Sequence, residues 1–417
     1  MQRLTTGHRW AALAALALGG FAVGLTEFVV MGLLPEMARD LLPTEYARSS
    51  ADAIAHAGWA ITVYALGVVA GAPTIAALTA RVARKPLVVG LLVLFVLGTA
   101  ASALAPTFPL VLAARFVAGL PHGAYFGAAG ILAANLIGPG SQAKGFAAVL
   151  TGLTAANIFG VPAITGLGQS TSWRVAYLAV AGVFLLTLVA VLATVPPLAA
   201  GPGGSIRAEL RAFRSPLVWL VAFVAAVGFG GFFAVYTYIA PITTHVAGLP
   251  ASAVPWALVV AGVGMTVGIL LGGVAGDRNL RRSLEFGFAG VVVTIALFGL
   301  IAGVPVGLFV GVFLLCAANM FMGPSFQARL IEVAPGAQLM GAAVNQSATN
   351  VANSVGAALG GVVIGAGLGY LSAVWVGVGL GLIGLALTAL SFRVRIRQPG
   401  PREPHAVGAS VAAPSPK

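Results

Sequence analysis

The stretch WAALAALALGGFAVGLTEFVVMGLLP (residues 10–35) decides the fold class. An α-helix rises about 1.5 Å per residue, so a run of this length crosses the roughly 30 Å hydrocarbon core of a bilayer. Its length, its lack of a clear cleavage site and the similar runs after it argue against a signal peptide. Further apolar runs of spanning length lie at 57–79, 86–105, 109–136, 145–168, 173–196, 217–241, 253–275, 284–303, 305–328, 339–366 and 368–392.

The composition of the whole chain agrees with this interpretation. The 417 residues are 59% hydrophobic and 8% charged, with a mean hydropathy of +1.02, whereas soluble domains are about 25% charged. A formal net charge of +12 would suggest a nucleic-acid partner in a soluble protein, but here there are too few charges to cover a water-facing surface. Since the runs are long and do not alternate strictly, the sequence predicts an all-α integral membrane protein with twelve transmembrane helices.

The basic residues are distributed unevenly between the two sides of the membrane. An even number of spans places both termini on one side, and most of the 22 lysines and arginines fall there. Arg39, Arg48 and Arg174 fall on the other side, and Arg115 lies inside a span. Positive residues favour the cytoplasmic side. The sequence therefore predicts a multi-pass protein of the bacterial inner membrane with both termini in the cytoplasm.

Most enzyme and cofactor classes lack their characteristic residues here. The chain has one cysteine, Cys316, and its five histidines do not occur at metal-ligand spacing such as HExxH. No lysine follows a glycine, which excludes a Walker A loop, and no G-x-S-x-G motif is present. We expect no enzymatic activity, no metal, no cofactor and no ATP site.

Short repeated motifs indicate that the chain consists of two related halves. RVARK (81–85) corresponds to RNLRR (278–282), GAYF (123–126) to GPSF (323–326) and ANIFG (156–160) to ANSVG (352–356), in the same order and at similar offsets. Such duplications are typical of secondary transporters, whose site lies between the halves. The predicted units are a six-helix half (1–196), a basic cytoplasmic linker (197–216), a second six-helix half (217–392) and a disordered cytoplasmic tail (393–417).

Five further motifs resemble those of the major facilitator superfamily, in its twelve-span drug:proton antiporter branch. They are GLTEFVVMGLLPEMARDL (24–41), YALGVVAGAP (64–73), RFVAGLPHGAYFG (115–127), ANIFGVPAITG (156–166) and YTYIAP (236–241). The fourth-span motif is similar to that of arabinose or sugar-efflux and chloramphenicol-export proteins. The resemblance covers about residues 10–392 and implies the major facilitator fold, with two pseudo-symmetric six-helix halves that work by alternating access.

The resemblance also implies a cytoplasmic gate and a helix-packing motif, and the chain departs from the family pattern in both. The loop motif after the second span has Ala80 where the family has aspartate, and Val161 separates the glycine and proline of the fifth-span motif. The gate residues implied are Arg81, Arg84, Lys85, Asp277, Arg278, Arg281 and Arg282. The helix-packing residues implied are Asn157, Gly160 and Pro162, with Asn353 and Gly356 in the second copy.

Glu27 and Arg115 are charged residues deep inside spans, where charges are rare, costly and usually functional. Counted along their antiparallel helices, the two side chains reach a similar depth. We expect a direct or water-bridged pair, with Glu27 as the proton carrier; the alternative is a buried carboxylate that is neutralised or kept protonated. His122 lies seven residues after Arg115 and could relay a proton, or could be a hydrogen-bonded packing residue.

The remaining candidates concern the substrate. In the resembled family the first, fourth, seventh and tenth spans line the cavity. Polar and adaptable apolar side chains suit such a pocket, although each could also serve ordinary packing. The predicted cavity residues are Tyr236, Tyr238, Asn319, Met320, Gln346 and Asn350.

The predicted function is export of a small molecule in exchange for protons, driven by the proton gradient. The partners expected are the small-molecule substrate, protons and the lipid bilayer, and the transport unit expected is a monomer. A uniporter or symporter, or a receptor or scaffold without transport, remains as an alternative, and the sequence does not identify the substrate.

Overall fold

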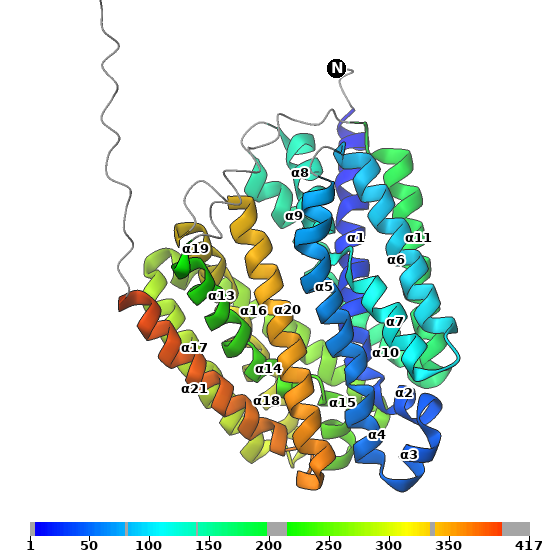
Figure 1. Ribbon diagram of the computed structural model, residues 1–417, viewed down its shortest axis with the longest axis vertical. Helices are drawn as coiled ribbons and strands as arrows, with labels where there is room; N and C mark the ends of the chain where they lie inside the picture. The colour runs from blue at the N-terminus through cyan, green and yellow to red at the C-terminus, as the bar shows by residue number, and fades with distance from the viewer. Residues whose placement is uncertain (1–4, 80–81, 139–140, 198–214, 334–337, 394–417) are drawn as a thin grey trace, which may run out of the picture.

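The computed structural model describes residues 5–79, 82–138, 141–197, 215–333 and 338–393, and these residues form helices and connecting turns without strands (Figure 1). Twelve helical stretches are long and apolar enough to cross a membrane. They are 6–32, 50–72, 84–104, 108–137, 144–170, 173–194, 216–236, 251–278, 280–301, 305–330, 344–368 and 372–393. The twelve predicted spans are thus confirmed, most of them to within a few residues.

The first six spans contain the helices α1 (Thr6–Gly32), α4 (Ser50–Ala57), α5 (Trp59–Leu78), α6 (Arg84–Leu104), α7 (Phe108–Gly119), α8 (His122–Ile137), α9 (Gln142–Ala155), the π-helical turn η1 (Ala156–Gly160), α10 (Val161–Ser170) and α11 (Trp173–Thr194). The segment 36–56, which lies between the first two predicted spans, is mostly helical. It forms α2 (Leu34–Leu41), α3 (Pro43–Arg48) and α4, because a proline at the first turn of α2 and α3 and the Ser49 cap of α4 each start a short helix.

The last six spans contain α13 (Pro216–Gly228), α14 (Gly230–Tyr236), α15 (Ile239–Pro241), η3 (Ile242–Val246), η4 (Ala251–Ala253), α16 (Val254–Arg278), α17 (Leu280–Ile301), α18 (Pro305–Phe321), α19 (Gly323–Val333), α20 (Gln338–Val363), η5 (Ile364–Leu368) and α21 (Ser372–Arg393). Most of the predicted linker and tail, residues 198–214 and 394–417, lies outside the described residues. The predicted domain boundaries therefore stay predictions.

Large apolar side chains cover the outside of the helix bundle. Leu270 is 65% exposed, Phe286 72% and Val306 75%. Exposure of such a surface to water costs a free energy of roughly 25 cal/mol per Å² of apolar area, whereas lipid tails would solvate it. Backbone polar groups are meanwhile satisfied within the helices, as a spanning segment requires.

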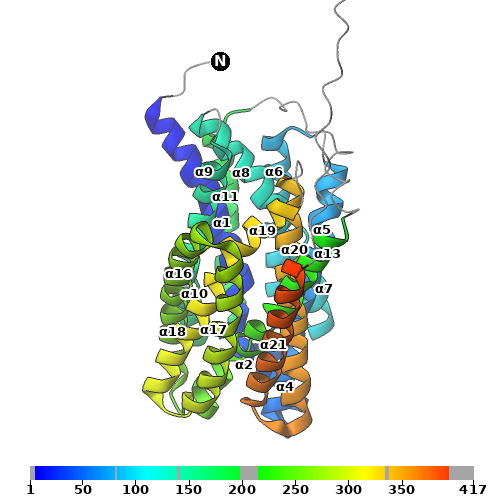
Figure 2. The same ribbon diagram turned by 90° about the vertical axis from the view of Figure 1, so that its left-hand side faces the viewer.

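The two halves meet along two seams (Figures 1 and 2). In one seam α5 packs against α20, and in the other η1 and α10 pack against α16. The second and eleventh spans correspond, through the internal repeat, to the eighth and fifth, so each seam is the counterpart of the other. The halves also touch through α2 and α15, and through α4 and η5. We call this end of the bundle the loop end, and the opposite end, where Thr6 and Arg393 lie, the terminus end.

The fourth and fifth spans each contain an irregularity. The fourth span breaks into α7 and α8 at Leu120 and Pro121, because proline cannot donate to the preceding turn. In the fifth span Val161 N–H bonds to the Ala156 carbonyl five residues earlier, which defines a π turn. This turn holds one residue more than an α turn, and Val161 is the residue that separates Gly160 from Pro162.

Candidate functional site: a buried polar cluster between the halves

Arg115 on α7 is completely buried in the N-terminal half. Its Nη1 donates to the Thr26 carbonyl at 2.8 Å and to Thr26 Oγ1 at 3.3 Å, and its Nε donates to the Ala60 carbonyl at 3.2 Å. The guanidinium also lies 4.2 Å from the centroid of the Tyr64 ring. These dipoles and the ring offset the cost of burying a cation. Arg115 thus holds the first, second and fourth spans together.

Glu27 on α1 is 8% exposed, and its backbone neighbour Thr26 is the acceptor of Arg115. The two charged residues therefore lie at a common depth, as the sequence indicates. The direct Glu27–Arg115 ion pair is nevertheless not formed within the 4.0 Å that defines one. The nearest basic nitrogen to the carboxylate is instead His122 Nε2, which lies 3.9 Å from Glu27 Oε2.

His122, the first residue of α8, is fully buried and has a partner at each ring nitrogen. Its Nδ1 lies 3.0 Å from Tyr64 Oη, and its Nε2 lies 3.1 Å from Gln346 Nε2 on α20. An amide nitrogen can only donate, so the imidazole nitrogen facing Gln346 accepts. His122 is therefore neutral in this arrangement, with its hydrogen on Nδ1 and directed at Tyr64.

Five side chains thus form one polar cluster, composed of Glu27, Tyr64, Arg115, His122 and Gln346. Four of them come from the N-terminal half and Gln346 comes from the C-terminal half. Glu27 and His122 can each carry a proton, and Glu27 Oε2 lies 3.9 Å from His122 Nε2. The cluster can therefore hold a proton at either of two neighbouring sites at the contact between the halves.

The sequence did not predict two residues of this site, Tyr64 and Thr26. Tyr64 opens the second-span motif, but an aromatic residue in a span is more often a packing residue than a hydrogen-bonding one. Thr26 serves Arg115 mainly through its backbone carbonyl, which has no signature in the sequence. The signal available for Tyr64 was its place, at the first position of a motif shared with a transporter family.

The predicted cavity residues fall into different surroundings. Tyr236 stacks on Phe232 of α14 and meets Phe28 of α1 edge-on. Asn319 is fully buried, and neither of its amide atoms has a hydrogen-bond partner. Met320 is half-buried. Asn350 is 2% exposed and donates to the Gln346 carbonyl one turn earlier.

Tyr238 lies at a contact between the two halves. Its hydroxyl donates to the Ala357 carbonyl at 2.9 Å, and a Cβ atom added to Gly58 of the other half would meet that hydroxyl at 2.5 Å. Only a residue without a side chain allows this approach. Tyr238 therefore packs between the halves near the loop end, and its predicted role in the cavity stays a prediction.

The residues of the helix-packing motif lie at or beside the seams. The Asn157 carbonyl packs so closely on Gly262 of α16 that a Cβ there would overlap it, and Gly160 packs on Phe21 and Leu25 of α1. Pro162 lies in the first turn of α10. In the second copy, Gly356 packs against the Gly230 carbonyl. Asn353 is 1% exposed, and its amide atoms have no hydrogen-bond partner.

The predicted gate residues form no hydrogen bond or ion pair between the halves in the part of the chain that the structure describes. Lys85 donates to the Leu192 carbonyl, and Arg281 pairs with Glu285 one turn along its own helix, at 2.8 Å. Asp277, Arg278 and Arg282 are exposed, Arg84 is half-buried, and Arg81 lies outside the described residues.

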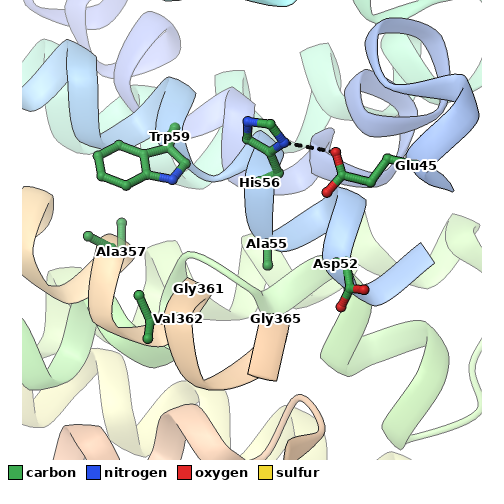
Figure 3. Close-up of a pocket in the computed structure, with 10 residues that line it drawn as sticks. Glu45, Asp52, Ala55, His56, Trp59, Ala357, Gly361, Val362 and Gly365 are labelled. Carbon is green, nitrogen blue, oxygen red and sulfur yellow. Dashed lines mark hydrogen bonds and ion pairs between the residues drawn. The ribbon is translucent and has the colours of Figure 1, made fainter. Parts of the chain in front are cut away.

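A separate hollow of about 250 Å³ opens at the loop end, across the α5–α20 seam (Figure 3). Glu45, Asp52 and His56 line one side, and Gly361 and Gly365 line the other. His56 Nδ1 lies 2.8 Å from Glu45 Oε2. None of the predicted cavity residues lines this hollow. Among the described residues, no group of three or more histidine, cysteine, aspartate or glutamate side chains could hold a metal ion.

Comparison with known proteins gives one family throughout. The family model for the Major Facilitator Superfamily matches residues 16–258. The inner membrane transport protein YdhP of Escherichia coli K12 is 36% identical over 359 residues, which cover 86% of this chain and 90% of that protein. The chloramphenicol resistance protein of Streptomyces lividans is 30% identical over 395 residues, which cover 94% and 98% of the two chains.

Among solved structures, a bacterial homologue of the human lysosomal transporter Spinster, crystallised in an inward-facing and unoccupied conformation, has a similar fold. The TM-score is 0.75 at 16% sequence identity, with 94% of this chain and 98% of that chain covered. The identity is low, so this likeness concerns the arrangement of the helices only.

Proposed function

Because the chain belongs to the Major Facilitator Superfamily, and is therefore a multi-pass membrane transporter rather than an enzyme, we propose that it exports a small molecule in exchange for protons. The observation that carries the proposal is the approach of Glu27 to His122, 3.9 Å apart and buried beside the contact between the halves. Ionisable residues inside a membrane protein typically mark proton or substrate paths. Glu27 would carry the proton, with Arg115 and His122 tuning its binding.

Arg115 supports this role without forming an ion pair. Its charge lies beside the backbone of Glu27, so it stabilises the ionised carboxylate from a distance, while burial favours the protonated one. A carboxyl group subject to two opposing influences can change its protonation when a substrate or a change of conformation alters one of them. A direct ion pair would hold the carboxylate ionised more firmly, and the separation seen here suits reversible protonation better.

The orientation and environment follow from the charges and the relatives. We place the protein in the bacterial inner membrane with both termini in the cytoplasm, since its basic residues gather on that side and YdhP is named for the same membrane. The loop end then faces outward and is closed by the contacts of Tyr238 and α4 with the opposite half. The basic loops near Arg84 and Arg281 would close the cytoplasmic side in the opposite state.

The substrate class proposed is a drug, a sugar or an amphipathic metabolite, and the name of the Streptomyces lividans relative makes chloramphenicol the first compound to try. The energy source proposed is the proton gradient, without ATP or a bound cofactor. Two six-helix halves make one complete transport path, so the unit proposed is the monomer.

A growth-inhibition panel in an efflux-deficient bacterial host identifies the transported compound, with chloramphenicol and arabinose analogues included. That compound is then measured in proteoliposomes with an imposed pH gradient, for the wild type and for Glu27→Gln. We expect Glu27→Gln to abolish proton-driven transport, and Glu332→Gln, which changes an exposed carboxylate in the same way, to leave it intact. Wild-type transport that continues after an ionophore collapses the gradient would indicate uniport. Proton-driven transport by Glu27→Gln would remove the proposed role of Glu27.

A further inference from the structure

We propose that Gln346 is the positioning residue through which the C-terminal half responds to a proton on His122. The neutral imidazole holds the Gln346 amide across the α5–α20 seam, and the protonated imidazole releases it and donates to Glu27 instead. This inference rests on the proposed proton coupling and adds to it a physical link between the proton and the relative position of the two halves.

With the Gln346 amide oriented as in the structure, the hydrogen-bonding capacity of the groups favours such an exchange. His122 Nε2 accepts from Gln346 Nε2 at 3.1 Å and lies 3.9 Å from Glu27 Oε2. Once Nε2 carries a proton it can only donate, and two donors facing each other repel. The Glu27 carboxylate is then the acceptor within reach, and a charge-assisted hydrogen bond to it is about twice as strong as a neutral one.

The groups around His122 leave Glu27 as the partner for a protonated ring. Helix α1 presents Glu27, α5 presents Tyr64, and α7 presents Arg115, which lies over the face of the Tyr64 ring. Helix α20 presents the uncharged Gln346. Helices α6 and α9 also pack on α8, and their basic residues, Arg84, Lys85 and Lys144, are half-buried or exposed near the terminus end, remote from the ring.

Because Gln346 lies on α20, the exchange of hydrogen-bond partners at His122 affects the α5–α20 seam. Two turns further along α20, towards the loop end, Ser354 and Thr62 donate to each other's backbone carbonyls at 3.3 and 3.4 Å. These hydroxyl contacts do not titrate. Protonation of His122 therefore loosens the seam on the terminus side of Ser354 and leaves the loop side bonded. An arrangement of the halves in which Gln346 does not contact His122 binds the His122 proton better than the present arrangement does. Low pH therefore disfavours the present arrangement.

The separation of the halves can be measured without substrate or gradient. Cysteines replace the exposed residues Lys144 on α9 and Ala328 on α19, in a Cys316→Ala background that removes the native thiol. Spin labels on the two positions report the populations of the arrangements in nanodiscs, by double electron–electron resonance, between about pH 4 and pH 8, a range that extends below the titration of an exposed imidazole. The series is measured with Glu27, the proposed acceptor of the protonated ring, and repeated with Glu27→Gln, which removes the carboxylate that would titrate beside the ring.

With Gln346 present, we expect the population of the present arrangement to fall at least about fivefold from high to low pH, as for a modest coupling between sites. Gln346→Leu should flatten this response. Gln346→Glu should reverse it, because its carboxylate accepts from the protonated ring and repels no donor. The matched control is Asn345→Leu, which removes a neighbouring amide bonded to Gln327 within the same half and should keep the response.

The reversal must also depend on the ring, so His122→Phe combined with Gln346→Glu should show no response. A response of the same direction with glutamine and glutamate at 346, or an unchanged response in Gln346→Leu, overturns the proposal. So does an absent response with Gln346 present, because the contact between the halves then does not respond to a proton on His122. Each of these results leaves the Glu27→Gln transport assay unaffected, so failure of this inference and failure of proton-coupled export are separate outcomes.

Discussion

Removal of the Tyr64 hydroxyl should weaken the polar cluster by a measurable and localised amount. In Tyr64→Phe the ring still covers Arg115, but His122 Nδ1 loses its partner, 3.0 Å away in a fully buried site. An unsatisfied buried donor costs about 1–3 kcal/mol in soluble proteins, whereas hydrogen bonds between membrane helices average about 0.6 kcal/mol, with a maximum near 1.7. Since both partners here are shielded from water, we expect a coupling near the upper value, about 1–1.5 kcal/mol.

A double-mutant cycle with His122→Leu isolates this contact, measured as the free energy of reversible unfolding in mixed micelles. Tyr64→Phe should be costly in the wild type and nearly neutral once His122 is gone. The matched control is Tyr238→Phe, which removes an equally buried hydroxyl that donates to the Ala357 carbonyl at 2.9 Å within the C-terminal half and should show no coupling to His122→Leu. A Tyr64–His122 coupling below about 0.3 kcal/mol, the additivity error for independent sites, would refute the reasoning.

Three further changes test other parts of the structure. Gly356→Ala would push a Cβ into the Gly230 carbonyl and should lower the free energy of unfolding by about 1–3 kcal/mol. At Gly182 a Cβ would meet open space, so Gly182→Ala should change the free energy of unfolding by no more than about 0.5 kcal/mol. Equal effects of the two substitutions would contradict the close packing at Gly356. Arg115→Lys forfeits the bond to the Ala60 carbonyl and should cost about 2 kcal/mol in the same assay, so wild-type stability would count against it. Cys316 is fully buried and should react with a maleimide only after unfolding, as followed by mass spectrometry; rapid labelling of the folded protein would contradict its burial.

The spans could be predicted because hydropathy is summed over about twenty residues, and single exceptions such as Glu27 do not change the total. The short helices at 34–48 were missed for the converse reason. Each of these helices depends on one proline or one capping side chain. A helix that is this short is easily assigned to a loop. The break at Pro121 and the π turn at Ala156–Gly160 are likewise local departures inside segments whose average composition reads as a continuous helix.

The members of the site were predictable singly, and their arrangement was not. Glu27, Arg115 and His122 stand out because charged and titratable groups in spans are costly, and Gln346 stands out as a polar residue in a span. Which of them touch is decided by the crossing of α1, α5, α8 and α20, about which residue spacing along one helix says nothing. The partners of Arg115 are mainly backbone carbonyls, and every residue has one. Of the two forms expected for the Glu27–Arg115 pair, the direct ion pair is absent, and the water-bridged form stays a prediction.

The π turn in the fifth span has a consequence for how such chains are compared. It accommodates one additional residue within the span, at the point where Val161 separates Gly160 from Pro162. An alignment that forbids a gap inside a transmembrane helix would rotate residues 157–161 by about 100° relative to their true equivalents, the angle between successive residues of an α-helix. A search for adjacent glycine and proline would pass over this span altogether. Insertions of one residue are therefore to be allowed at this point when the family's ancestry is traced.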